Sequence, residues 1–369
     1  MRSNISHISA AFFLLLSVVT WGQNNSTCYG EVMVGKVAKH RDGLLYEVPP
    51  VSMIFQAGKV MQTDGSKPWH DYWGYPRLEQ SVHFNVFGET DVLGYAIGAA
   101  PGVGFYMFRG DRSSLLLHLA TGLAYLTREF NPLTNPSNNA IGSNFNNTTQ
   151  IKLSYETPII KTLSLDIGFG LTHYSNGLNS SPNSGINVIG FHFGIKPTIA
   201  NRKVPKGSIA QPLTISKNWG INGYVSYGLS EHRITGGPKY PIKNYTLGIF
   251  YQSHSFIKWH AGLDYDYALV FYEFAIRDFQ SEEDANGKAT STAAYAAIEG
   301  VFGDLSVRCQ VGYYLEIFYD RQESLPYSKF NFIYNIPYEI YEVRPFVGLL
   351  LKTHVAVADY VALQVGIEW

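Results

Sequence analysis

The chain has 369 residues, which is enough for a large core without extra cross-links. Charged residues make up only 15%, well below the roughly 25% of ordinary soluble domains, while aromatic residues also reach 15%. The net charge of −1 gives no sign of a nucleic-acid partner or of a basic membrane tether. A mean hydropathy of −0.06 excludes a membrane protein built from many apolar helices.

An apolar run, Ala10–Val19, lies close to the start of the chain. It follows Arg2 and precedes the small residue Gly22. Ten residues are too few for a membrane-spanning helix but suit the core of a secretory signal peptide; a buried hydrophobic helix is the alternative. The sequence therefore predicts a signal peptide over residues 1–22 and an exported chain from 23 to 369.

After residue 28 the chain alternates between apolar and small or polar residues in many short segments. Leu115 to Tyr125 is one such segment, and Val361 to Trp369 at the C-terminus is another. Alternation over about ten residues is typical of transmembrane β-strands, whereas strands of soluble β-sandwiches are usually about five or six residues long. Trp369, on the apolar face, resembles the C-terminal signal of outer-membrane barrel proteins.

These segments predict an all-β protein with a single transmembrane antiparallel β-barrel. We count about 14 strands, within a range of 8 to 16, at roughly 25 residues for each strand with its connection. The sheet must close, because an open edge in lipid would leave backbone groups unpaired. A smaller barrel with a separate C-terminal part is the alternative. The longest expected connections are residues 131–149, about 200–217, and 281–291.

The two cysteines, Cys28 and Cys309, are not expected to form a disulfide. Cys309 falls in an alternating row that should face lipid, and Cys28 lies near the start of the exported chain. Two such positions are unsuited to the narrow geometry of a disulfide bond.

A hairpin over about residues 163–195 combines an apolar strand with a group of polar residues at its end. Successive side chains of a strand point to opposite faces, so His173 and Ser175 continue the apolar row that begins at Leu163. Asn187 opens the apolar row of the following strand. If the hairpin is symmetric about Ser180, His173 and Asn187 face each other on the lipid side of the barrel.

This arrangement suits a nucleophile, a base and an orienting group. A serine needs an imidazole to take its proton, and the imidazole needs an acceptor on its other nitrogen. The side-chain oxygen of Asn187 can be that acceptor, although it carries no charge. The alternative is that His173 and Ser175 are polar residues that merely mark the membrane interface. Neither a metal-ligand spacing nor a phosphate-binding glycine loop is apparent, so we predict no metal and no cofactor.

The segment "HYSNGLNSSPNSGIN" (His173 to Asn187) resembles the active-site segment of the PagL-type lipid A 3-O-deacylases, and residues 122–146 and 352–369 more loosely resemble segments of the longer acyloxyacyl hydrolases. These are outer-membrane barrels that cleave an ester-linked acyl chain from lipid A. The resemblance implies that His173 is the base and Ser175 the nucleophile. It further implies that Asn176 and Asn183 help to form the oxyanion hole. The short members of the family are eight-stranded and carry a glutamate where this chain has Asn187.

Two functions follow as hypotheses. The first is an outer-membrane serine esterase of a Gram-negative bacterium, acting on lipid A or lipopolysaccharide with its active site facing the outer leaflet. The second is a passive barrel, either a channel or a structural protein, since inward rows rich in Gly, Ala and Ser could leave a pore at about 14 strands. The sequence leaves the oligomeric state open.

Overall fold

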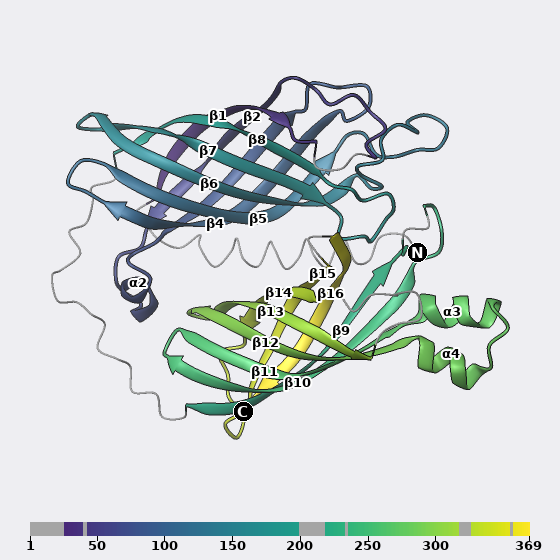
Figure 1. Ribbon diagram of the computed structural model, residues 1–369. Helices are drawn as coiled ribbons and strands as arrows, with labels where there is room; N and C mark the ends of the chain where they lie inside the picture. The colour runs from purple at the N-terminus through teal and green to yellow at the C-terminus, as the bar shows by residue number, and fades with distance from the viewer. Residues whose placement is uncertain (1–25, 40–42, 199–217, 233–234, 317–325, 355–356) are drawn as a thin grey trace. The chain divides into compact units, whose positions relative to one another are not determined.

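The computed structural model describes residues 26–39, 43–198, 218–232, 235–316, 326–354 and 357–369 (Figure 1). The expected signal peptide, residues 1–22, lies outside the described residues. No helix within these described ranges is long and apolar enough to cross a membrane.

The first half of the chain forms a closed barrel of eight antiparallel strands, in which each strand pairs with its neighbour in sequence. β1 pairs with both β2 and β8, and this second pairing closes the sheet. The strands are β1 (Ser26–Val37), β2 (Ser52–Gln62), β3 (Arg77–Val86), β4 (Tyr95–Arg109), β5 (Ser114–Leu126), β6 (Phe145–Ile160), β7 (Leu163–Ser175) and β8 (Ile186–Pro197).

The second half forms another closed barrel of eight strands. β9 pairs with both β10 and β16, so this barrel closes on its own strands. The strands are β9 (Trp219–Ser230), β10 (Tyr240–His254), β11 (Ile257–Ala268), β12 (Thr290–Phe302), β13 (Leu305–Glu316), β14 (Tyr327–Asn335), β15 (Arg344–His354) and β16 (Val357–Glu368).

The expectation of one barrel of about 14 strands is therefore wrong, and the alternative of a smaller barrel followed by a separate part is nearer to the structure. The alternation of a strand depends on its two faces, one toward lipid and one toward the lumen. This alternation is the same in barrels of any size, so it does not reveal which strands pair to close the sheet.

In the described part of the chain, three short helices lie in connections between strands: α2 (Pro68–Tyr72), α3 (Leu269–Arg277) and α4 (Glu282–Lys288). α3 and α4 connect β11 to β12 (Figure 1). The side chain of Ser281 caps α4 by accepting a hydrogen bond of 3.1 Å from the backbone N–H of Asp284, and acidic residues fill the first turn. Residues 281–291 were expected to form a loop, but a good N-cap makes most of this segment helical.

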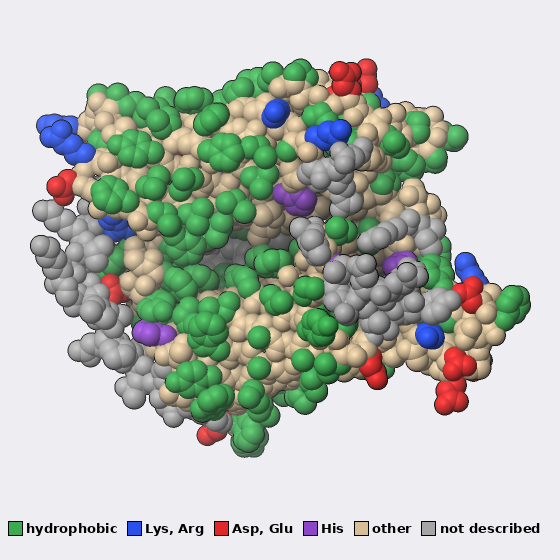
Figure 2. Space-filling view, viewed as in Figure 1, with side chains coloured by type: hydrophobic (Ala, Val, Ile, Leu, Met, Phe, Trp, Pro, Cys, Tyr) green, Lys and Arg blue, Asp and Glu red, His purple; other side chains and the backbone are tan. Residues whose placement is uncertain are grey.

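The outer walls of both barrels are apolar, as the alternation predicts. In β5 the odd-numbered residues from Leu115 to Tyr125 face outward and are partly or fully exposed, while His118 is buried in the lumen. In β16 the row that includes Val365 and Ile367 faces outward, and Gln364 faces inward. Figure 2 shows hydrophobic side chains spread over the outer walls, with few charged groups among them. Cys28 and Cys309 are exposed free thiols on β1 and β13.

Buried ion pairs occupy the lumen of the first barrel. Lys152 Nζ lies 2.6 Å from Glu31 Oε1, and Lys196 Nζ lies 2.7 Å from Asp166 Oδ2. Arg77 and Lys196 both bind the carboxylate of Glu156. These side chains are nearly inaccessible to solvent, so each charge depends on its partner for the interactions that water would otherwise supply.

The lumen of the second barrel is filled in the same way. Arg308 binds Glu299 at 2.7 Å and Glu368 at 3.1 Å. Lys329 binds Asp264 at 2.8 Å, and Lys352 binds Asp266 at 2.6 Å. Eight strands enclose a lumen narrow enough for side chains to fill. The wide pore on which the channel hypothesis depended is therefore missing from both barrels as described.

These buried pairs lead to a stability prediction. Arg308→Met should lower the free energy of unfolding by about 3 kcal/mol or more, because it leaves the buried carboxylates of Glu299 and Glu368 short of a cation. Arg344→Met is the control, since the Arg344–Glu339 pair is about half exposed and should contribute less than about 1 kcal/mol. Urea titration of the refolded protein, followed by gel mobility, measures both changes. Equal effects of the two substitutions would contradict the prediction.

Candidate active site

The candidate site lies on the hairpin formed by β7 and β8, at the end where β7 stops and β8 begins. His173 and Asn187 are direct register partners in this hairpin. The Nδ1 atom of His173 lies 2.6 Å from Oδ1 of Asn187, which is a short hydrogen bond. The pairing of these two residues, predicted from the symmetry of the hairpin, is confirmed.

The faces of the two strands are also as predicted. Thr172 and Tyr174 on β7 are buried in the barrel, whereas His173 and Ser175 are only half-buried and lie on the outer wall. Asn187 lies on the same wall. Ser175 is the last residue of β7, two positions after His173, so its hydroxyl is on the same face as the imidazole.

Apolar packing supports the site from inside. Tyr174, Ile186 and Val188 are fully buried and belong to a cluster that also includes loop residues such as Leu93 and Ile141.

The backbone conformation of Gly185 also holds the imidazole of His173 in place. Gly185 has φ of +80°, and a Cβ there would lie 2.9 Å from Cε1 of His173. A side chain at this position would therefore displace the imidazole as well as strain the backbone.

The asparagines after β7 hold the connecting loop in place. The backbone N–H of Asn176 donates to Oδ1 of Asn183 at 3.0 Å, and Nδ2 of Asn176 donates to Oγ of Ser143 at 3.0 Å. The hydrogen bond to Oδ1 fixes the orientation of the Asn183 carboxamide, whose NH2 group is its only side-chain donor. The structure thus brings Asn176 and Asn183 together directly beyond Ser175.

The sequence analysis missed polar residues on the neighbouring strands. Asn147 and Thr149 on β6 are the register partners of Ser175 and His173, and Thr121 on β5 is the partner of Thr149. Residues 131–149 were expected to form a loop because they are rich in Asn, Thr and Pro, but from Phe145 onward they belong to β6. After Phe145 the sequence NNTTQ (146–150) is polar at every position, so no alternation of apolar and polar residues marked this segment as a strand.

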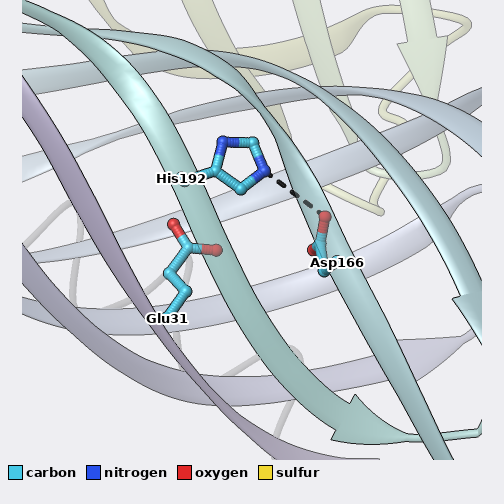
Figure 3. A group of neighbouring side chains, drawn as sticks. All are labelled: Glu31, Asp166 and His192. Atoms are coloured by element: carbon cyan, nitrogen blue, oxygen red, sulfur yellow. Dashed lines mark hydrogen bonds and ion pairs between the residues drawn. The ribbon is translucent and has the colours of Figure 1, made fainter. Parts of the chain in front are cut away.

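Among the residues that the structure describes, two groups of buried side chains have the composition of metal ligands. Figure 3 shows the first, Glu31, Asp166 and His192, in the lumen of the first barrel. The carboxylates of Glu31 and Asp166 already bind Lys152 and Lys196. The second group, His260, Glu299 and Glu368, is similarly paired with Arg308 and Lys258. A metal ion would compete with these buried cations, so neither group suits one.

A closed antiparallel barrel with an apolar outer wall defines a class of protein, the outer-membrane β-barrels, and the first barrel also carries a histidine–asparagine pair on that wall. Residues 55–196 match the family model described as Lipid A 3-O-deacylase (PagL), and residues 218–369 match that of the Acyloxyacyl hydrolase, C-terminal domain. The chain belongs to this family of ester-hydrolysing enzymes, the PagL-type lipid A 3-O-deacylases and acyloxyacyl hydrolases.

Two of the solved structures to which the chain is similar are the following. The outer membrane enzyme PagL shares 16% identity over 46% of this chain and 97% of its own, with a TM-score of 0.32. CdiB from Acinetobacter baumannii shares 8% identity over 94% of this chain and 60% of its own, with a TM-score of 0.20. A comparison of the sequence with curated proteins gives no match.

Proposed function

We propose that this protein is a serine esterase that hydrolyses an ester-linked acyl chain of lipid A in the outer membrane of a Gram-negative bacterium. Ser175 is the nucleophile, His173 is the general base, and Asn187 orients the imidazole. Asn176 and Asn183 help to form the oxyanion hole together with nearby backbone N–H groups. Residues 1–22 serve as the export signal.

The hydrogen bond between His173 and Asn187 carries this proposal. A carboxamide oxygen can only accept, so Nδ1 of His173 bears the proton and Nε2 is left unprotonated. Nε2 is the nitrogen that takes a proton in a serine–histidine pair. Asn187 therefore fixes the tautomer that catalysis requires, as the asparagine does in cysteine–histidine–asparagine proteases.

The reaction proceeds in two halves. His173 takes the hydroxyl proton of Ser175 while Oγ attacks the ester carbonyl, and amide donors at the loop stabilise the resulting oxyanion. The alcohol leaves with the proton from His173, and an acyl-serine remains. Water then attacks this ester with the same help from His173, which releases a fatty acid and restores Ser175.

The position of the site supports a lipid substrate. His173, Ser175 and Asn187 lie on the outer wall of the barrel rather than in its lumen. The connections at this end include the 18-residue segment 127–144 between β5 and β6, whereas two of those at the opposite end, 110–113 and 161–162, have only four and two residues; segment 63–76, which contains α2, is the exception there. Outer-membrane barrels place long connections outside the cell and short turns in the periplasm. The site therefore faces the outer leaflet, where lipid A is found.

The direct test is hydrolysis of lipid A by the purified protein in detergent. Mass spectrometry should show that lipid A loses one ester-linked acyl chain, with the matching free fatty acid appearing in equal amount. Intact lipid A after prolonged incubation with the folded barrel would count against this substrate.

A further inference from the structure

Three polar side chains form a continuous group on the outer wall next to Ser175. We call this group, Thr121 on β5 with Asn147 and Thr149 on β6, the polar ladder. Nδ2 of Asn147 donates to Oγ1 of Thr121 at 2.9 Å, and Oγ1 of Thr149 donates to Oδ1 of Asn147 at 2.8 Å. The two threonine hydroxyls are 3.1 Å apart. The polar ladder is thus a closed ring of three hydrogen bonds.

The register places this ring directly beside the candidate catalytic residues. Asn147 faces Ser175 across the β6–β7 pair, and Thr149 faces His173. Directly opposed residues of neighbouring antiparallel strands have Cβ atoms about 5 Å apart. Asn187 occupies the corresponding position on the other side of His173. The site therefore has an orienting group on its β8 side and the polar ladder on its β6 side.

The polar ladder lies in a part of the wall that should be apolar. Phe145 and Tyr125 pair at the loop end of β6 and β5, with ring centroids 5.3 Å apart, and both are exposed. Exposed aromatic pairs of this kind mark the membrane interface in outer-membrane barrels. Asn147 and Thr149 are two and four residues further along β6, or about 7 and 14 Å along the strand toward the bilayer interior. Placing polar side chains in the apolar part of a bilayer costs free energy, so polar residues found there usually serve a function.

The pattern of donors decides what the polar ladder can bind. Thr149 gives its only hydroxyl proton to Asn147, so Thr121 must give its own to Thr149. The second N–H of the Asn147 amide donates to the backbone oxygen of Gly122 at 3.0 Å. Every donor of the ring is therefore used, whereas each of its three oxygens keeps acceptor capacity. The polar ladder offers acceptors only.

We propose that the polar ladder is a substrate subsite that accepts a hydrogen bond from a neutral hydroxyl or amide N–H next to the scissile ester. The inference rests on the proposed role of Ser175 as the nucleophile. An anionic phosphate or carboxylate is a poor ligand, because it too can only accept. The donor belongs either to the acyl chain or to the alcohol part of the substrate, and both parts lie close to the ester carbonyl.

Three matched esters separate these two sources. The first has an unsubstituted acyl chain and a simple alcohol, the second adds a hydroxyl to the acyl chain near the carbonyl, and the third adds an amide N–H to the alcohol part. The wild-type enzyme should hydrolyse the second or the third with kcat/KM roughly 10-fold above the first, as expected for one additional satisfied hydrogen bond. If the ester with the acyl-chain hydroxyl is hydrolysed faster, the donor belongs to the acyl chain. If the ester with the amide N–H is hydrolysed faster, the donor belongs to the alcohol part.

Variants test whether the polar ladder is responsible. Thr121→Val with Thr149→Val should lose most of the preference, which is measured as the ratio of kcat/KM between the substituted and the unsubstituted ester so that any general change in rate cancels. Thr149→Ser, which keeps the hydroxyl, should retain the preference. Thr157→Val is the matched control, because Thr157 lies on the outer wall of the same strand at the opposite end.

A preference absent from the wild-type enzyme, or unchanged in the double valine variant, would overturn the inference. Ser175→Ala keeps this outcome separate from the proposed function. If that variant is inactive and the preference is unchanged by valine, only the subsite is wrong; if it is active, the esterase proposal itself is wrong. Heat-dependent gel mobility shows whether each variant is folded, and valine on a lipid-facing wall should leave the barrel at least as stable as the wild type.

Discussion

Ser175→Ala should lower the rate of ester hydrolysis by roughly 10³-fold or more, because it removes the proposed nucleophile. His173→Ala should be about equally damaging, and combining the two should cause little further loss, since a nucleophile and its base act as one unit. The side chain of Ser175 lies on the outer wall, so its removal costs the lumen no contact. Release of fatty acid from lipid A by the refolded variants measures the effect.

Ser328→Ala provides the matched control for this experiment. Ser328 also lies on an outer wall, on β14 of the second barrel, so it tests the loss of a lipid-facing hydroxyl without the histidine. It should keep full activity. Should Ser175→Ala match the wild-type rate, the serine mechanism would have to be abandoned.

The second large effect is expected at Asn187, where the short members of the family carry glutamate. Asn187→Glu should raise the rate up to about 10-fold, because a carboxylate stabilises the imidazolium that forms when His173 takes the serine proton. A charge near the end of the strand costs less than one at the centre of the bilayer. Steady-state rates on one soluble ester compare this variant with the wild type.

Asn187→Ala is the companion variant, and it should lower the rate by roughly 10-fold. It leaves His173 in place but removes Oδ1 of Asn187, which lies 2.6 Å from Nδ1 of His173 and accepts its hydrogen bond. If Asn187→Glu were inactive while Asn187→Ala retained activity, Asn187 would have a role other than orienting the imidazole.

The facing of each strand and the pairing of His173 with Asn187 could be predicted because both depend on local rules. Side chains alternate strictly along a strand, and a hairpin that folds symmetrically brings equidistant residues together. Trp369 and the row before it illustrate the first rule, and the register of β7 with β8 illustrates the second.

The closure of the barrels could not be predicted in this way, because it depends on pairing between distant strands. β8 pairs with β1, more than 150 residues earlier, rather than with β9. The charged residues on the lumen rows, such as Glu31, Lys152 and Lys196, indicated a narrow barrel. Buried charges need partners of opposite sign close by, and a narrow barrel supplies them more readily than a wide pore.

Composition misled the prediction at the start of β6. Asn147 and Thr149 belong to residue types common in loops, and the tract before them is a true connection. In a membrane barrel, polar residues on an outward row are also what a lipid-facing site requires. Residue type alone could not distinguish a loop from a lipid-facing site. The register does, because Asn147 lies opposite Ser175 and Thr149 opposite His173.

The five candidate catalytic and oxyanion residues all fall within the 15 positions from His173 to Asn187, on one hairpin and its loop. Many enzymes gather such groups from segments scattered along the chain, so that several distant segments must change together when the chemistry does. Here all five residues lie on two adjacent strands and the loop between them. A barrel with the same strand tilt could acquire these residues, or lose them, through the exchange of a single hairpin, provided that the new strands also supply the lumen ion pair that Asp166 on β7 and Lys196 on β8 form here.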